Sequence, residues 1–382
     1  MLNISIEKIK SPVEKQKIEL VERKGLGHPD YICDLCCEAV SRALSQEYTK
    51  RFGTVLHHNV DKGLLVAGKS IPKFGGGRVL EQIKLTVAGR ATSRVGKQKI
   101  DVKRIAFKAV KKELNRFRYL KDKDIKIIID IMEGAANLQE VFKKEIAVAN
   151  DTSFGAGHYP LSRLESVVKK VAYLLNSKLF LNKFKAVGED IKVLGLRKEN
   201  KIRLTLAIAF VDKYVRSMDQ YILIKQKVLD YVKRFAGKDI EIDINTLDDE
   251  TKDEKSIYLT VTGLSAEHGD DGNTGRGNRM NGLITPNRPV SLEATAGKNI
   301  NHPGKLYQVM AYEIAKRVGK LKGINECIVK LASQIGKPLD EPQIASIAVN
   351  GNNNRIKNIV ESVFRDIKKI QKNIVKGRYE VF

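Results

Sequence analysis

The sequence has little or none of several features that mark special classes of protein. It contains no tryptophan, its aromatic residues make up only 6% of the chain, and it has four cysteines among 382 residues. The sequence has no run of about 18 apolar residues, the length that a membrane-spanning helix needs. Residues 1–10 lack the apolar stretch of a secretory signal. We therefore expect no membrane partner and a cytoplasmic location.

The cysteines are too few for a disulfide framework or a complete structural zinc site. Cys33 and Cys36 have the spacing of half a zinc or redox site, but no second pair supplies the remaining ligands. With Cys37 they lie in a stretch whose apolar residues recur at helical spacing. We expect reduced thiols that face a core.

Acidic residues are scarce relative to basic ones, which gives a formal net charge of +24. A nucleic-acid-binding protein is one explanation. However, the lysines are scattered along helical faces, and no aromatic-rich strand for base stacking is interleaved with them. We expect no specific nucleic acid as a partner and interpret the charge as a surface that attracts anionic substrates.

Helical segments alternate with pairs of strands in this sequence. Strands are predicted at Val13–Glu22, Leu64–Ala67, Val79–Ala88, Ile125–Met132, Ile202–Phe210, Ile240–Ile244, Ile257–Val261, Glu326–Ala332 and Ile344–Val349. Helices are predicted from Pro29 to about Phe52 and at Ile100–Phe117, Leu161–Leu175, Met218–Phe235, Gly304–Val318 and Ile356–Ile370. Paired strands favour an α+β fold over a doubly wound parallel sheet. We expect three interlocked, pseudo-repeated units of mixed or antiparallel sheet with helices on one face, approximately residues 1–135, 136–255 and 256–382, which exchange segments.

One segment matches the P-loop pattern G-x-x-x-x-G-K-[ST], from Gly63 to Ser70. A P-loop needs a helix after the lysine, but Ile71 and Pro72 follow here, and the four middle residues favour a strand. We interpret the match as a buried strand that ends in a turn. It nevertheless keeps a phosphotransferase open as an alternative function.

Carboxylates, glycines and arginines are most concentrated in the eleven residues from Gly269 to Arg279. These residues lie inside a long segment without helical or strand periodicity. Asp270 and Asp271 suit Mg²⁺, the glycines allow close approach of the backbone, and Arg276 can pair with phosphate oxygens. This loop is therefore typical of a site for a metal-bound polyphosphate.

Four shorter motifs supply further candidates. His28 and Asp30 lie at a predicted helix start, where an anion is favoured, and Asp34 follows one turn later; plain helix capping explains them too. Asp190 and Lys192 alternate onto one strand face, which could equally be a solvated face. The remaining candidates are Asp151 in a polar turn, where an Asx turn is the alternative, and Lys298, His302 and Lys305 near a helix start, where surface lysines are common.

The motifs GHPD, NDTSFG, GEDIK, GDDGNTGRGNR and TAGKN occur in this order, and the set resembles S-adenosylmethionine synthetase. The forms HHNVDK, PKFGGG and GRGNRMNGLITPNRP are similar to the archaeal branch of that family. The resemblance extends from about Glu19 to Tyr307. It implies synthesis of S-adenosylmethionine from ATP, L-methionine and water, through attack of the methionine sulfur on C5′ of ATP and hydrolysis of the expelled triphosphate.

The resemblance also implies roles for individual residues. His28 would assist departure of the triphosphate, while Lys192, Arg276 and Lys298 would hold its phosphates. Metal ligands would be Asp30, Asp270 and Asp271, and substrate contacts would come from Asp151, Asp190, Asp61, Lys62, His302 and Lys305. Further implied are Mg²⁺, with two ions per site, K⁺ as an additional cation, and a homodimer with active sites at its interface.

The sequence departs from the bacterial pattern of this family at two places. Tyr31 follows GHPD where bacterial members have lysine, so one phosphate cation must come from elsewhere. The bacterial glycine-rich segment becomes Glu293-Ala294-Thr295-Ala296-Gly297-Lys298, which keeps only the Gly-Lys ending.

Overall fold

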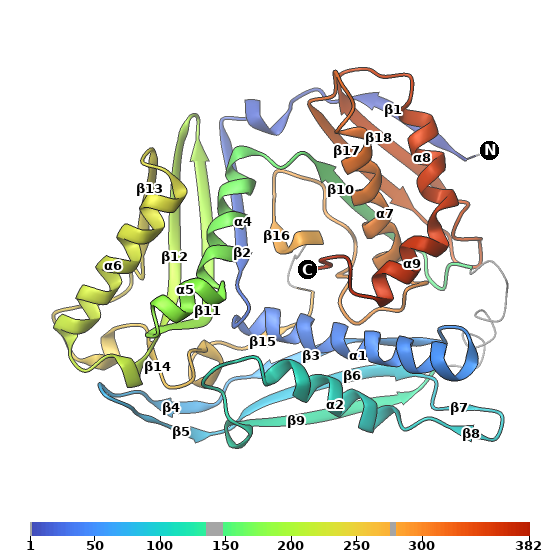
Figure 1. The fold of residues 1–382 in the computed structure, drawn as a ribbon. Helices are drawn as coiled ribbons and strands as arrows, with labels where there is room; N and C mark the ends of the chain where they lie inside the picture. The colour runs from blue at the N-terminus through green and yellow to red at the C-terminus, as the bar shows by residue number, and fades with distance from the viewer. Residues whose placement is uncertain (1, 135–147, 276–279) are drawn as a thin grey trace.

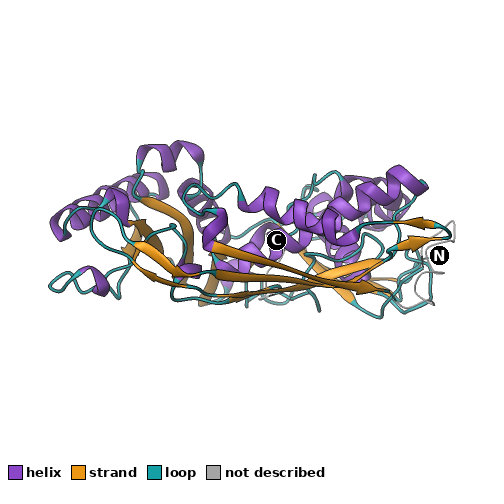
Figure 2. Cartoon of the chain, turned by 90° about the horizontal axis from the view of Figure 1, so that it is seen from below, coloured by secondary structure: helices purple, strands orange, loops and turns teal. Residues whose placement is uncertain are grey.

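The computed structural model describes residues 2–134, 148–275 and 280–382. Three mixed sheets form the fold, and each carries its helices mainly on one side (Figures 1 and 2). The prediction of an α+β fold with mixed sheets is therefore confirmed. Within the described ranges, no helix combines the length and apolar character that a membrane crossing needs.

The first sheet has the order β15-β3-β6-β9. Its strands are β15 (Gly272–Asn273), β3 (His58–Val66), β6 (Ile83–Ala91) and β9 (Ile125–Glu133), and its helices are α1 (Pro29–Phe52) and α2 (Val102–Leu114). Apolar side chains from α1, α2 and the sheet form one core, which includes Cys33, Cys36 and Cys37. These thiols and Cys327 are buried and free, as predicted. Burial raises the pKa of each well above its usual value.

The second sheet has the order β13-β12-β11-β2-β16, with β14 paired to β12. Its strands are β13 (Ile240–Ile244), β12 (Lys201–Val211), β11 (Val187–Lys198), β2 (Ile18–Lys24), β16 (Leu283–Ile284) and β14 (Leu259–Thr260), and its helices are α4 (Arg163–Leu175), α5 (Lys178–Lys183) and α6 (Met218–Ala236). Strand β2 from the N-terminal part of the sequence and β16 from its last third thus complete a sheet whose other strands lie between them in sequence.

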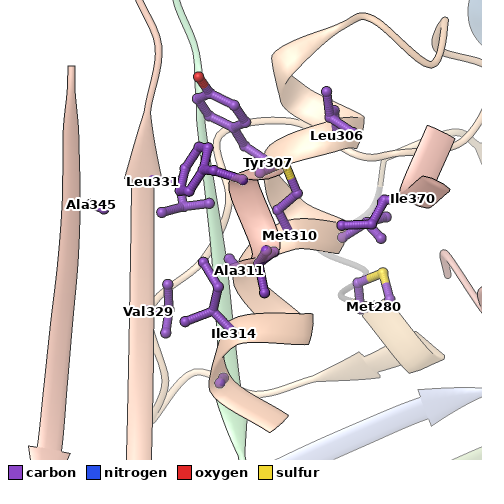
Figure 3. Packing of buried hydrophobic residues seen from close by; sticks show 14 of the residues in the cluster. Met280, Leu306, Tyr307, Met310, Ala311, Ile314, Val329, Leu331, Ala345 and Ile370 are labelled. Atoms are coloured by element: carbon purple, nitrogen blue, oxygen red, sulfur yellow. The ribbon is translucent and has the colours of Figure 1, made fainter. Parts of the chain in front are cut away.

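The third sheet has the order β1-β18-β17-β10. Its strands are β1 (Ile4–Lys8), β18 (Ile344–Asn350), β17 (Glu326–Ala332) and β10 (Phe154–Tyr159), and its helices are α7 (Pro303–Val318), α8 (Ile356–Arg365) and α9 (Ile367–Val375). Helix α7 is buried against β17 and β10, and Figure 3 shows Tyr307, Met310 and Ile314 of α7 packed beside Val329 and Leu331 of β17. Met280, close to Ile370, belongs to the same core.

Short elements connect these layers. The hairpins are β4 (Lys69–Ile71) with β5 (Arg78–Glu81), and β7 (Arg94–Val95) with β8 (Gln98–Lys99). The 3₁₀ helices are Val13–Lys15, Asp122–Asp124, Asp212–Tyr214, Glu254–Ser256, Ser265–Glu267 and Met280–Gly282.

Several predicted elements differ from those observed. The predicted strand Val13–Glu22 begins only at Ile18, and Ile257–Val261 is reduced to the two residues of β14. The predicted last helix is two helices, because the chain turns at Asp366, which ends α8 and begins α9. Strand β1 was not predicted; it forms because it pairs in parallel with β18 from the far end of the sequence.

The P-loop-like segment is a strand followed by a turn, as predicted, but the expected burial is wrong in part, because Leu64 and Val66 are 51% and 42% exposed. Gly63 to Val66 lie inside β3, and Lys69 begins β4 of a hairpin in place of a helix. Gly68 donates its backbone N–H to the carbonyl of Ala266 at 2.9 Å. The segment therefore has neither the helix nor the open loop that a phosphate cradle requires.

Candidate active site

A cavity of about 800 Å³ brings together residues from three predicted motifs. His28, Asp190, Lys192 and Asp270 line it, together with Ser265 and the loop that follows β13. These residues span more than 240 positions of the sequence. They come together because β2 pairs with β11, and because the chain continues from β2 directly into the turn before α1. The cavity is thus the meeting point of the GHPD, GEDIK and Asp270 segments.

His28 is held at the N-terminus of α1 in one orientation and one tautomer. Its Nδ1 accepts the backbone N–H of Asp30 at 3.2 Å, as the N-cap of the helix. The ring proton of the neutral imidazole must then lie on Nε2, which is 3.5 Å from Oδ2 of Asp270. The helix start therefore presents an N–H donor at a fixed position on the cavity wall.

The segment from Gly269 to Asn281 is here called the Asp270 loop. Two buried carboxylates attach its first part to α1. Asp30 Oδ1 accepts the N–H of Asn273 at 3.0 Å, and Asp34 Oδ1 accepts that of Gly275 at 3.3 Å. The other Asp30 oxygen accepts a hydrogen bond from Lys24 Nζ at 2.7 Å. Glycine is required at position 272, directly before Asn273, because a β-carbon there would collide with the backbone of Pro29.

Asp190 and Lys192 both line the cavity, but their environments differ. The Asp190 carboxylate is fully buried and accepts the backbone N–H and the hydroxyl of Ser265 at 2.8 and 2.5 Å. Burial raises the pKa of Asp190 to about 7, and the Ser265 hydrogen bonds oppose that rise only in part. The Lys192 side chain is 43% exposed and pairs with Glu22 at 3.3 Å, so its ammonium can move toward a ligand.

A second cluster surrounds Lys298, at a turn that follows the long loop. The Lys298 ammonium lies 2.5 Å from both Asp61 on β3 and Glu293, and it is almost completely buried. Burial alone would raise the pKa of Asp61, but the charges and hydrogen bonds of Lys298 and Lys62 together outweigh burial and lower the pKa to about 2. The lysine is therefore a fixed cation between two ionised carboxylates.

His302 joins this second cluster through the same geometry that holds His28. Its Nδ1 accepts the backbone N–H of Gly304 at 3.0 Å as the N-cap of α7. Nε2 lies 3.6 Å from Oδ2 of Asp151 and 3.8 Å from Oε2 of Glu293. Burial lowers the pKa of His302 to about 4, so the ring is neutral at pH 7.

Four predicted site residues lie elsewhere or outside the described ranges. Lys305 is fully buried 2.7 Å from Glu38, whose carboxylate also accepts the Gly297 N–H at 3.1 Å. The Lys62 ammonium is exposed and pairs with Asp61, while Asp271 accepts the N–H of Ala67 at 2.7 Å, away from His28. Arg276 lies outside the described residues.

Sequence reasoning did not identify Glu38, Glu293, Lys24 and Ser265. A signal for Glu38 was present, because Asp30, Asp34 and Glu38 are spaced four residues apart and lie on one helix face. All three are buried. Carboxylates repeated on a buried helix face indicate a functional or structural network.

Comparisons with known proteins identify the family. A family model for S-adenosylmethionine synthetase (AdoMet synthetase) matches residues 2–378. The S-adenosylmethionine synthase of Pyrococcus furiosus is 46% identical over 402 aligned positions that cover 100% of this chain and 99% of the relative. That of Hyperthermus butylicus is 46% identical over 409 positions, covering 100% and 99%.

A solved structure supports the fold independently. An unusual S-adenosylmethionine synthetase from Campylobacter jejuni superposes with a TM-score of 0.64, over 94% of this chain and 90% of the other, at 17% sequence identity. That structure shows the fold alone, whereas the full-length relatives at 46% identity are S-adenosylmethionine synthases. The chain therefore belongs to the S-adenosylmethionine synthetase family, in its archaeal type, and is a methionine adenosyltransferase that makes S-adenosylmethionine.

Proposed function

We propose that the cavity around His28 holds the reacting end of ATP and that the Lys298 cluster of a second copy completes the triphosphate site. One observation carries this proposal. Of the described residues that line the cavity, His28, Asp190, Lys192 and Asp270 belong to the predicted site, whereas none comes from the Lys298 cluster. In a single chain, the residues of the predicted site thus form two separate groups.

The proposed reaction is a displacement at C5′ of ATP. The methionine sulfur forms the new bond to C5′, the bond from C5′ to the triphosphate oxygen breaks, and its electron pair leaves with the triphosphate. A thioether carries no proton to remove, so the protein needs no general base. The task of the protein is to stabilise negative charge on the departing oxygen and positive charge on the new sulfonium.

The residues fit these two demands. His28 Nε2–H is a donor held by the helix start, so it can bond the departing oxygen without reorganising. Lys192 and Lys298 supply positive charge for the phosphates, and we propose that Arg276 adds to it. We propose that the Asp151 carboxylate favours the sulfonium or the methionine ammonium. We propose that the expelled triphosphate is then hydrolysed to phosphate and diphosphate in the same enclosure.

The residues present also fit Mg²⁺, which binds one or two carboxylates together with substrate phosphates. Asp270 is the best-placed ligand, since its half-exposed carboxylate adjoins His28 on the cavity wall. Asp30 can join it if Lys24 moves to a phosphate, whereas Asp271 is engaged with Ala67. When bound, Mg²⁺ would neutralise charge on the triphosphate. That two ions bind per site, and that K⁺ takes part, stay predictions.

A homodimer is the second part of the proposal. The helices lie mainly on one side of the sheets (Figure 2), and on strands of the first two sheets exposed apolar side chains alternate with buried ones. On β2 and β11, Leu20 lies opposite Leu196 in the sheet register, and they are 40% and 38% exposed. Ile18, Leu194, Leu64 and Val66 are likewise exposed on strands of the first two sheets. A row of exposed leucines on a sheet is typical of a protein interface, here with a second copy.

The fold supports one finer proposal about its units. We propose that the three sheets with their helices are pseudo-repeated units that interlock by exchanging strands, near residues 1–135, 136–255 and 256–382. The best support is a recurring helix start, since α1 and α7 each begin with a capping histidine followed by proline, His28-Pro29 and His302-Pro303.

The experiment that tests this function compares the enzyme with and without methionine. We expect release of phosphate and diphosphate from ATP that requires methionine, together with a sulfonium product of the mass of S-adenosylmethionine. Equal phosphate release without methionine would favour the phosphotransferase alternative instead. Salt-sensitive RNA binding without methionine-dependent turnover would favour the nucleic-acid alternative.

A further inference from the structure

The last residues of the chain enter the centre of the molecule. Figure 1 shows the C-terminus beside β16, between the second sheet and the helices of the third. Val381 and Phe382 are buried and belong to the same apolar core as Met280 and Ala296. The family model ends at residue 378, so the contacts of residues 380–382, here called the tail, lie beyond the matched region.

The tail holds the far end of the Asp270 loop. The Glu380 carbonyl accepts the backbone N–H of Asn281 at 3.2 Å. The Arg23 guanidinium donates to the Asn281 carbonyl and, at 2.9 Å, to the Glu380 carboxylate. These contacts hold Asn281 in a left-handed conformation with a φ of 72°, which asparagine adopts more readily than most residues. It lies five residues after Arg276 in sequence.

The tail also holds the turn that carries Lys298. The Thr295 hydroxyl donates a hydrogen bond to the carbonyl of Val381, and both groups are buried. The Thr295 carbonyl accepts the backbone N–H of Lys298 at 3.3 Å, which closes the turn. One hydrogen bond from the tail therefore fixes the first residue of the Thr295–Lys298 turn.

A third contact reaches the start of α1. The Phe382 ring packs edge-on against Tyr31, with ring centroids 5.1 Å apart and an interplanar angle of 68°. Tyr31 follows Asp30 directly and stands where bacterial members have lysine. In this chain, the residue at this position contacts an aromatic residue of the tail. Burial raises the pKa of the Tyr31 hydroxyl to about 12.

We propose that Glu380, Val381 and Phe382 are positioning residues for adenosyl transfer, which hold the start of α1, the chain at Asn281 and the Thr295–Lys298 turn in place for the two sites to which one chain contributes. The tail touches each of these segments and none of its side chains lines the cavity around His28, so it acts through other residues. This inference rests on the proposed roles of Lys298 and the Asp270 loop in holding the leaving group.

The test uses the full chain and inorganic triphosphate as the probe. Thr295→Val keeps the shape of the side chain but removes its hydroxyl, Thr295→Ser restores the hydroxyl, and Phe382→Leu removes the ring while keeping an apolar side chain. Val360→Ala, in the same core on α8, is the control for lost stability alone. Each protein is assayed well below its own melting temperature, with rates expressed per titrated active site.

We expect Thr295→Val and Phe382→Leu to lower kcat on the order of tenfold and to weaken triphosphate binding by a similar factor, because small displacements of charged groups are costly in a site of this kind. The KM for methionine should stay within about twofold, and Thr295→Ser should recover most of the lost rate. If both variants match Val360→Ala, with lower stability but unchanged kcat and triphosphate affinity, the inference is overturned.

Lys298→Ala separates this inference from the proposed function. Loss of triphosphate binding in Lys298→Ala, together with normal binding in the tail variants, would overturn the tail inference alone. Normal triphosphate binding in Lys298→Ala would overturn the proposed leaving-group site, and the tail inference with it.

Discussion

His28 and His302 are equivalent in geometry although 274 positions separate them in the sequence. Each accepts a backbone N–H through Nδ1 as the N-cap of a helix, and each is followed by proline. Each therefore carries its ring proton on Nε2, which faces the carboxylate of Asp270 in one case and those of Asp151 and Glu293 in the other. Capping thus converts two histidines into fixed N–H donors.

The first prediction separates capping from catalysis at His28. His28→Asn keeps a good N-cap but lacks the imidazole N–H, whereas His28→Ala loses both. We expect kcat to fall roughly 10²–10³-fold in both variants, the scale for removal of one transition-state donor. Only His28→Ala should also lose stability, by about 1 kcal/mol. Steady-state rates and denaturant unfolding measure the two effects. A His28→Asn enzyme with near-normal kcat would exclude the donor role.

The second prediction compares two lysines that follow a glycine. We expect Lys298→Ala to lose most of its turnover, on the order of 10²-fold or more, because the fixed cation between Asp61 and Glu293 disappears. Lys69→Ala is the matched control, since Lys69 begins β4 and its side chain is 66% exposed. Turnover near normal is expected there. The opposite ranking would support the P-loop interpretation.

Much of the fold could be predicted from periodicity, whereas the site could be predicted only in parts. Strands such as β13 and β17 match their predicted bounds because buried apolar residues recur at every second position in each. The Asp61–Lys298 ion pair joins residues 237 positions apart, and only the folded topology brings them together. Helical spacing alone could not reveal that Lys305 pairs with Glu38 in the core.

The third prediction concerns stability in acid. Burial lowers the pKa of His302 from 6.5 to about 4, so between these values the unfolded chain binds more protons than the folded one. The stabilising contribution is complete above pH 6.5 and is lost as the pH falls through about 4. Its size is on the order of 3 kcal/mol.

His302→Asn keeps a helix cap but does not titrate in this range. Unfolding free energies should therefore decline more steeply with acid in the natural protein than in the variant. Both proteins are measured at one fixed concentration, because association would shift apparent stability. Parallel pH profiles would show that His302 does not titrate as described.

The fourth prediction concerns the exposed apolar sheet face. Leu196→Glu places a charge in the row opposite Leu20, and we expect a monomer with little activity but a largely retained melting temperature. Leu223→Glu on α6 is the control, since its side chain is 53% exposed on the helical side. Light scattering after size-exclusion chromatography gives the mass of each. An unchanged dimer in Leu196→Glu would place the interface elsewhere.

The most direct test of the composite site is complementation between His28→Ala and Lys298→Ala. The two chains are co-expressed with different affinity tags, and the mixed dimer is selected by both. If each site combines His28 of one chain with Lys298 of the other, one site of the mixed dimer carries both changes and its second site carries neither. We predict about half of the natural turnover per mixed dimer, while each parent homodimer stays nearly inactive. A mixed dimer as inactive as its parents would contradict the account.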